Sequence, residues 1–230
     1  MKNHLLSLTA FAVCLIAAAV PAIAQTVYSN GPINGTTDAW TINSGFEVSD
    51  SFRSCCHGGG DSPSGGATVT GLSFGAWLFP GDVLQSVEVS ITSSEFGGTS
   101  FYDQVVNFTQ SGCSGNQYGF NVCTETSDSS FGAVNLAAGT FWLNLSNAVV
   151  NTGDPVYWDE NSGLGPGSDG PSTASENSVG TIPSESFTIL GTQTSSTSTT
   201  SSGGTVPEPS SIMLLGSGIL GLAGLLRRRF

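Results

Sequence analysis

The sequence has very few cations. Of its 230 residues only 5 are Lys or Arg, against 17 Asp and Glu, which gives a formal net charge of -12 at pH 7. Lys2 and Arg227–Arg229 lie at the two ends, so Arg53 is the only Lys or Arg between them. Proteins that bind nucleic acid neutralise phosphates with clustered Lys and Arg. Because no such basic patch can form, we expect no nucleic acid partner.

Segments with a convincing helical period are also missing before residue 211. The 31 Gly and the abundant Ser and Thr exclude a helical bundle and favour short strands joined by turns. Val87, Val89 and Ile91 alternate with polar residues, as in a strand with one buried face. Apolar or β-favouring runs separated by turn residues occur at 39–48, 68–79, 83–92, 101–109, 118–124, 131–136, 140–149 and 186–190. This spacing predicts an all-β fold, an antiparallel, jelly-roll-like β-sandwich over residues 25–190.

The N-terminal residues have the organisation of a secretory signal peptide. Lys2 precedes an apolar stretch over 5–20, and Pro21-Ala22-Ile23-Ala24 supplies a small-x-small cleavage sequence. We expect residues 1–24 to engage the secretory translocon and to be removed before Gln25. A retained N-terminal anchor is the alternative, but the apolar run is short for a membrane-spanning helix.

The C-terminal residues have three features in a fixed order. Pro207-Glu208-Pro209 is followed by an apolar run at 212–226, and the chain ends on Arg227-Arg228-Arg229-Phe230. Fifteen helical residues would measure about 23 Å, slightly less than the ~30 Å hydrocarbon core, so a single C-terminal transmembrane helix is expected. The arginines would stay on the cytoplasmic side and the preceding domain would face outward.

This tail resembles the PEP-CTERM protein-sorting signal of Gram-negative bacteria, which also combines a Pro-Glu-Pro motif, a Gly-containing helix and terminal arginines. The resemblance covers residues 206–230. It implies recognition by an exosortase, a membrane-embedded cysteine transpeptidase, with processing at or near Pro207–Pro209 and release to the cell surface. Similar tails are also named the C-terminal region of ice-binding proteins, a label that concerns the tail alone. An anchor that is never cleaved is the alternative.

Residues 191–205 read GTQTSSTSTTSSGGT and have no apolar periodicity. Such a segment cannot bury enough surface to offset its ordering, so we expect a flexible Ser/Thr-rich linker between the β-domain and the sorting signal.

Four cysteines remain after the signal peptide, and an even number in an exported protein predicts disulfides. Cys113 and Cys123 could close one short loop, which would leave Cys55 and Cys56 to form a vicinal bond. Alternatively, each of the adjacent cysteines could pair with one of the distant two, so three connectivities are open. His57 could complete a zinc site with these cysteines, but adjacent ligands do not suit a tetrahedral centre.

The loop at 151–168 contains Asp154, Asp159 and Glu160, whose oxygens could bind calcium, although their spacing matches no calcium-loop motif. A solvated acidic loop is the favoured interpretation, and no other cofactor is expected. Tyr157 and Trp158 in the same loop are residue types that stack on sugar rings, with Trp158 the best single candidate.

No nucleophile, phosphate-binding or dinucleotide motif is present, so we do not expect an enzyme. The sequence predicts an exported cell-surface or extracellular-matrix protein with a structural or interaction role in the envelope or exopolysaccharide. A carbohydrate-binding module that contacts extracellular polysaccharide is the alternative, and a secreted hydrolase is third. Before processing, the C-terminal helix would anchor the chain in the inner membrane.

Overall fold

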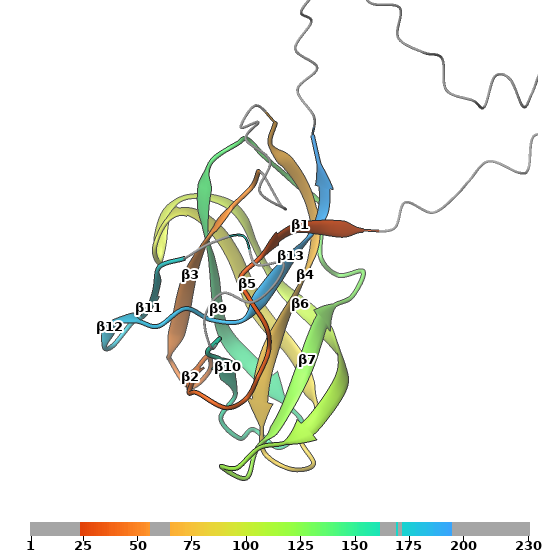
Figure 1. The fold of residues 1–230 in the computed structure, drawn as a ribbon, viewed down its shortest axis with the longest axis vertical. Helices are drawn as coiled ribbons and strands as arrows, with labels where there is room; N and C mark the ends of the chain where they lie inside the picture. Colours follow the sequence, from red (N-terminus) through yellow and green to blue (C-terminus); the bar gives the residue numbers. More distant parts are fainter. Residues whose placement is uncertain (1–23, 56–64, 162–168, 170–171, 195–230) are drawn as a thin grey trace, which may run out of the picture. The chain divides into compact units, whose positions relative to one another are not determined.

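The described part of the chain is an all-β, antiparallel domain. The computed structural model describes residues 24–55, 65–161, 169 and 172–194 (Figure 1). The strands are β1 (Gln25–Ser29), β2 (Ala39–Thr41), β3 (Glu47–Arg53), β4 (Ala67–Leu78), β5 (Leu84–Ser94), β6 (Gly97–Gly115), β7 (Asn121–Ser127), β8 (Val134–Leu136), β9 (Thr140–Val150), β10 (Tyr157–Asp159), β11 (Ala174–Glu176), β12 (Gly180–Ile182) and β13 (Phe187–Gln193). The predicted fold class, all-β and antiparallel, is confirmed.

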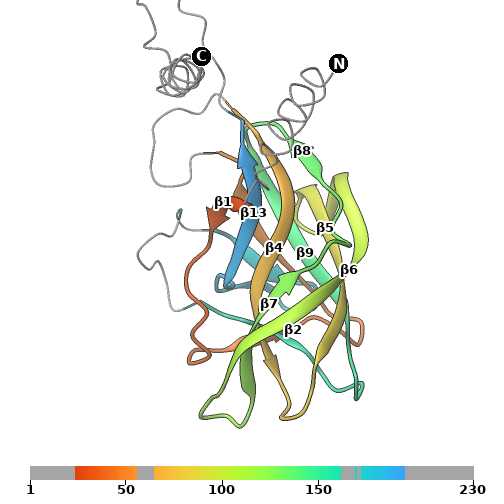
Figure 2. The same cartoon turned by 90° about the vertical axis from the view of Figure 1, so that its right-hand side faces the viewer.

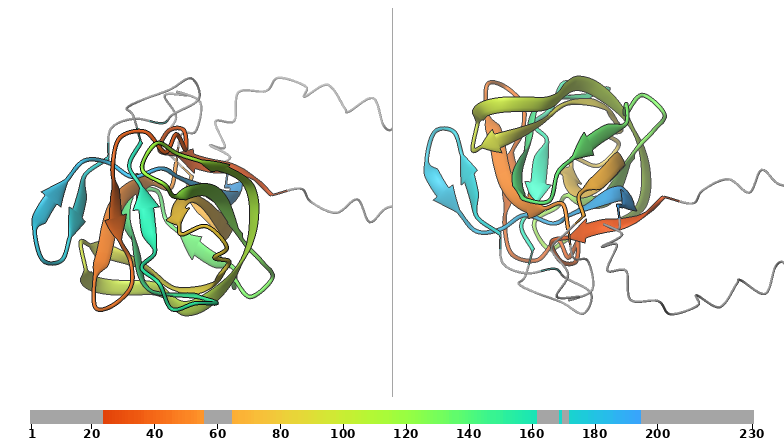
Figure 3. Two further views of the ribbon diagram at one scale, coloured as in Figure 1. Left: turned by 90° about the horizontal axis from the view of Figure 1, so that it is seen from below. Right: turned by 90° about the horizontal axis from the view of Figure 1, so that it is seen from above.

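The strands form one hydrogen-bonded path in the order β1-β13-β4-β7-β6-β5-β9-β3-β11-β12. Outside this path, β8 and β10 pair with β4, and β2 pairs with β10. Strand β6 is 19 residues long: its first half pairs with β5 and its second half with β7. It therefore joins the two layers that the sequence predicted as the packed sheets of a sandwich. The result is a sheet curled into a half-barrel (Figure 3), with β13, β4 and β7 adjacent on one side (Figure 2).

The core lies inside this curled sheet. Val87, Val89 and Ile91 are fully buried, as their alternation predicted. Side chains from β3, β4, β9 and β13 complete the core, because each strand presents every second residue to the interior. Four of the larger buried residues are Phe52, Phe74, Leu143 and Phe187.

The sequence runs cover the long strands and the short strands β2 and β8, and they miss β1, β10, β11 and β12. The run predicted at 39–48 is two strands, β2 and β3, separated by a turn in which Ser44 and Gly45 have positive φ values of 57° and 93°. The three-residue strands β10, β11 and β12 have too few residues to show an alternation. Strand β13 continues to Gln193, three residues beyond the predicted boundary at Leu190.

No helix within the described ranges is long and apolar enough to cross a membrane. The predicted signal peptide, the C-terminal helix at 212–226 and the sorting motif all lie outside those ranges, as does the predicted linker from residue 195 onward.

Candidate functional site

A disulfide closes the β6–β7 hairpin. Cys113 and Cys123 are bonded, with Cα atoms 4.1 Å apart and a sequence separation of 10. This confirms the disulfide prediction and selects the local pairing. Closing a loop of this size stabilises the fold by about 3 kcal/mol. Because both sulfurs are used, the zinc set with Cys55, Cys56 and His57 cannot form. Cys55 is half-buried after β3, and Cys56 and His57 lie outside the described residues.

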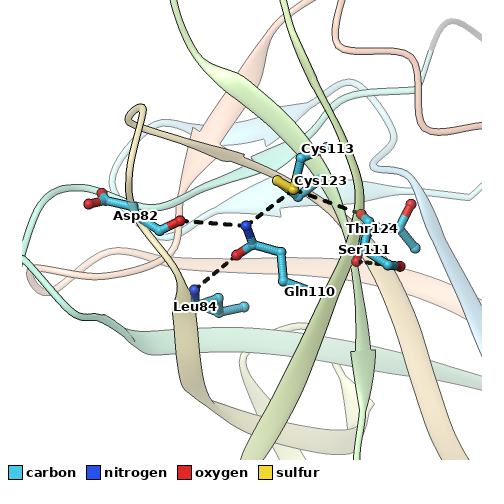
Figure 4. Close-up of a disulfide and its surroundings, with 7 residues drawn as sticks. All are labelled: Asp82, Leu84, Gln110, Ser111, Cys113, Cys123 and Thr124. Atoms are coloured by element: carbon cyan, nitrogen blue, oxygen red, sulfur yellow. Dashed lines mark hydrogen bonds between the residues drawn. A yellow bond between two sulfur atoms is a disulfide. The ribbon is translucent and has the colours of Figure 1, made fainter.

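Gln110 fastens the base of this hairpin to the start of β5. Its Oε1 accepts a hydrogen bond from the Leu84 N–H at 3.2 Å, and its Nε2 donates to the Asp82 carbonyl at 3.5 Å and to Cys113 Sγ at 3.1 Å (Figure 4). The hairpin is thus held by a covalent bond and by a polar side chain.

The tip of the hairpin carries aromatic side chains that meet others on the outer face of β4 and β10. Tyr118 stacks on Trp77 with ring centroids 5.5 Å apart and planes 20° apart. Phe120 contacts Trp77 at 5.7 Å, Phe79 at 4.9 Å and Tyr157 at 5.4 Å. We call these five residues the aromatic platform. Tyr118 is 52% exposed and Phe79 37% exposed, so the platform presents ring surface to solvent.

Strand register explains why these residues converge. On β4, Leu72, Phe74 and Ala76 point into the core, so Trp77 points outward. Tyr157 of β10 pairs with Trp77 and shares its face of the sheet. These positions are distant in sequence, so composition alone gave no sign of the platform.

The turn at the hairpin tip is built on Asn116. Its Oδ1 accepts hydrogen bonds from the N–H groups of Tyr118 and Phe120, each at 3.0 Å. Gly119 between them has φ of 88°, a left-handed conformation that favours glycine. The turn therefore fixes the backbone at both aromatic residues.

Asp159 anchors the platform from beneath. Its Oδ1 accepts from Trp77 Nε1 at 2.6 Å and from the Gly35 N–H at 2.9 Å. Its Oδ2 accepts from the Asn34 N–H at 3.0 Å and from Ser186 Oγ at 3.1 Å. Burial raises the pKa of Asp159, although all four hydrogen bonds act to lower it. The carboxylate fixes the Trp77 ring and the loop at 31–37 that lies over the sheet.

The prediction of calcium binding by Asp154, Asp159 and Glu160 is wrong as a shared site. Both oxygens of Asp159 already accept hydrogen bonds, and Glu160, its neighbour along the extended chain, points to the opposite face. Asp154 is exposed in the preceding loop, where its carbonyl accepts from Asn43. In the part of the chain that the structure describes, no three acidic, His or Cys side chains are arranged to hold a metal.

The prediction that Trp158 stacks on sugar rings is also wrong. It is 0% exposed, it packs against Phe74 and Phe187 in the core, and its Nε1 donates to the Ser186 carbonyl at 2.9 Å. No face of the ring is available to a sugar. Its neighbour Tyr157 points to the other face and joins the aromatic platform, so the sequence found the correct dipeptide and favoured the wrong residue of it.

Three further carboxyl groups are fully buried, and sequence reasoning did not single them out. Asp50, Glu125 and Glu185 are each 0% exposed. Burial raises the pKa of Asp50 to about 7 and that of Glu125 to about 8, and it raises the pKa of Glu185 well above its ordinary value. No sequence signal marks them, because each stands alone among residues of a strand or strand end.

The C-terminal residues match a known protein family. Residues 205–229 match the family model of the PEP-CTERM protein-sorting motif, the family that the tail resembled. The chain therefore carries an export-associated sorting signal of the kind that an exosortase processes. No curated protein matches the chain.

Proposed function

We propose that this chain is an exported, exosortase-sorted protein of the cell surface or extracellular matrix that has a structural or interaction role and no enzymatic one. The sorting motif at 205–229 is the observation that carries the proposal. The Cys113–Cys123 disulfide supports it, since such bonds persist in oxidising, extracytoplasmic compartments. The domain would act by being displayed in the envelope or exopolysaccharide of a Gram-negative bacterium after transient anchoring in the inner membrane.

Replacing Glu208 tests the sorting step. In a host that has an exosortase, Glu208→Gln should retain the chain in the inner-membrane fraction, whereas Ser210→Ala should be released like the wild type. Cell fractionation followed by immunoblotting distinguishes the two. Equal release of both variants would contradict exosortase processing at Pro207–Pro209.

The aromatic platform favours a second candidate function, carbohydrate binding. Ring faces beside polar loop groups suit stacking on the apolar faces of sugars, and Tyr118 offers the most exposed ring of the five. The disulfide and the Asn116 turn fix the platform before binding, which lowers the entropy cost of association. The binding residues would be Tyr118, Tyr157 and Phe79 instead of Trp158.

Retention on the host's extracellular polysaccharide tests this function. Tyr118→Ala should weaken saturable retention by about 5- to 30-fold, given that a stacked ring contributes on the order of 1–2 kcal/mol. Phe46→Ala removes an aromatic residue of similar exposure, 40%, outside the platform and is the matched control. Equal retention of both variants would show that the aromatic platform does not bind the polysaccharide.

A further inference from the structure

Two acidic residues from distant parts of the chain lie next to each other inside the half-barrel. Asp50 lies on β3 between Val48 and Phe52 and points inward with them. Glu185 lies just before β13 and is bridged to Glu160, so both of these glutamates face the same side. Asp50 and Glu185 are in contact, since the Glu185 N–H donates to Asp50 Oδ2 at 2.8 Å. The negative groups that act most on Glu185 are Asp50 first and Glu160 second.

Three of their four carboxylate oxygens lack a hydrogen-bond partner. Asp50 Oδ2 is well supplied, because it accepts from Asn30 Nδ2 at 3.0 Å as well as from the Glu185 N–H. Asp50 Oδ1 and both Glu185 oxygens are buried without a partner. A buried ionised carboxylate without donors is strongly unfavourable unless a proton or a cation compensates it.

Four oxygen atoms lie close to one nitrogen of Asn30. Asn30 Nδ2 lies within 3.0 Å of Asp50 Oδ2, Ser172 Oγ, Ser184 Oγ and the Glu185 carbonyl, at 3.0, 2.8, 2.6 and 2.7 Å. An amide nitrogen has only two hydrogens, and Asn161 Nδ2 and the two serine hydroxyls supply further hydrogens to this cluster. Oxygen atoms from several segments therefore converge here, and oxygen atoms are the ligands that a hard cation prefers.

No cationic side chain is among the groups that act most on Asp50 and Glu185. Arg53 is the only Lys or Arg within the described ranges, and it is exposed. The other titratable groups near the two acids are Asp159 and Asp38 beside Glu185, and Tyr28 beside Asp50. Arg53 acts on Tyr28, but it is not among the groups that act most on either carboxylate.

We propose that Asp50 and Glu185, completed by the neutral oxygens around Asn30, bind a hard divalent cation of the calcium class. The observation that no three acidic side chains converge does not conflict with this site, because calcium accepts carbonyl and hydroxyl oxygens beside two carboxylates. The cation would link β3 to the segment that enters β13.

Thermal melting with and without calcium tests the site. Full-length protein is stripped with chelator, dialysed at pH 7.5 and melted in metal-free buffer or in 5 mM Ca²⁺. An extracellular site with Kd of roughly 0.1–1 mM would raise Tm by about 3–9 °C for a domain of this size. Glu185→Gln should lose this shift. Neither oxygen of Glu185 accepts a hydrogen bond, so the substitution removes charge without removing a native hydrogen bond.

Glu125→Gln is the matched control. Glu125 is equally buried and both its oxygens also lack partners, but it faces the core from β7 and no other charged group acts on it. This variant should keep the full calcium shift. Equilibrium dialysis should find one Ca²⁺ per chain in the wild type and in Glu125→Gln, and none in Glu185→Gln.

Two results would overturn the proposal. An equal calcium shift in wild type and Glu185→Gln would mean that the ion binds elsewhere. No calcium shift and no bound ion in the wild type would mean that protons alone compensate the two acids.

Discussion

Asp159 and Glu185 are both buried acids, yet the regions around them differ in hydrogen bonding. Under the aromatic platform, Asp159 accepts four hydrogen bonds, two on each oxygen. Within the half-barrel, the carboxylate of Glu185 accepts none, and the residue lies beside Asp50, which has an unpartnered carboxylate oxygen of its own. The oxygens of Asp159 have all the hydrogen-bond donors that a buried structural carboxylate needs. Those of Glu185 have none, so an ion or a proton must compensate its charge. The two acids are equally buried, so burial does not distinguish them. The number of hydrogen bonds that each carboxylate accepts does distinguish a structural acid from a candidate metal ligand.

Asp159→Asn should have the largest effect, a destabilisation of about 3–4 kcal/mol. The amide nitrogen cannot accept the hydrogen bonds that one carboxylate oxygen receives, so two buried donors lose their acceptor. Urea unfolding measures the loss. Asp154→Asn, at an exposed acid in the preceding loop, should change stability by less than about 0.5 kcal/mol. Equal stability of the two variants would contradict the anchoring role of Asp159.

Reduction of the Cys113–Cys123 bond should cost about 3 kcal/mol of stability and loosen the platform. Melting curves with and without reductant check this expectation. The calcium shift should survive reduction below the melting transition, because the disulfide and Asp50 lie on different strands. An unchanged Tm with reductant would show that the disulfide does not stabilise the fold.

Metal-free protein should be more stable at pH 5 than at pH 8.5. The folded-state pKa values of Asp50 and Glu125, about 7 and about 8, lie above the ordinary values of 3.8 and 4.5. Their stabilising contribution is therefore complete below about pH 4 and is lost as the pH rises through 7 and 8. Glu125→Gln should remove roughly 3–4 kcal/mol of this dependence between pH 5 and pH 8.5. A pH profile that the substitution leaves unchanged would contradict the assignment to Glu125.

Glu185→Gln should stabilise the metal-free protein at pH 7.5 by about 1 kcal/mol, since it removes a buried acid that has no donor. The sign is opposite to that of Asp159→Asn, although both substitutions convert an acid to its amide. Urea unfolding of both variants in chelator tests the comparison directly. A similar destabilisation in both would abolish the distinction drawn between the two acids.

Tyr118→Ala should have the smallest effect on stability, within about 1 kcal/mol, because half of its side chain is already in solvent. Its effect on polysaccharide retention should be much larger than its effect on Tm. A large loss of stability would instead show that Tyr118 contributes to core packing. Binding by the aromatic platform would then be tested with Phe79→Ala.

Features that are encoded in a short stretch of sequence could be predicted, whereas features that depend on contacts between distant strands could not. The alternation of Val87, Val89 and Ile91 and the tail at Pro207–Pro209 are contained in short stretches, so the strand and the sorting motif could both be predicted. Trp158 and Tyr157 are adjacent, and only the register of β10 against β4 decides which one is buried.

The two acidic regions depended on contacts between distant segments. Asp50 and Glu185 are 135 residues apart, and nothing local to either predicts that they meet. Asp159 was correctly noticed as an acid in a polar segment, but its four donors come from three other parts of the chain. Such sites are defined by topology, which the periodicity of single strands does not determine.

The intact mass of the protein recovered from the host's surface tests the central claim most directly. Sorting by an exosortase predicts a chain that begins at Gln25 and ends at or near Pro207–Pro209, without Arg227–Arg229 and with two hydrogens fewer for the Cys113–Cys123 bond. A mass that includes the chain through Phe230 would contradict exosortase processing and leave an uncleaved anchor in its place.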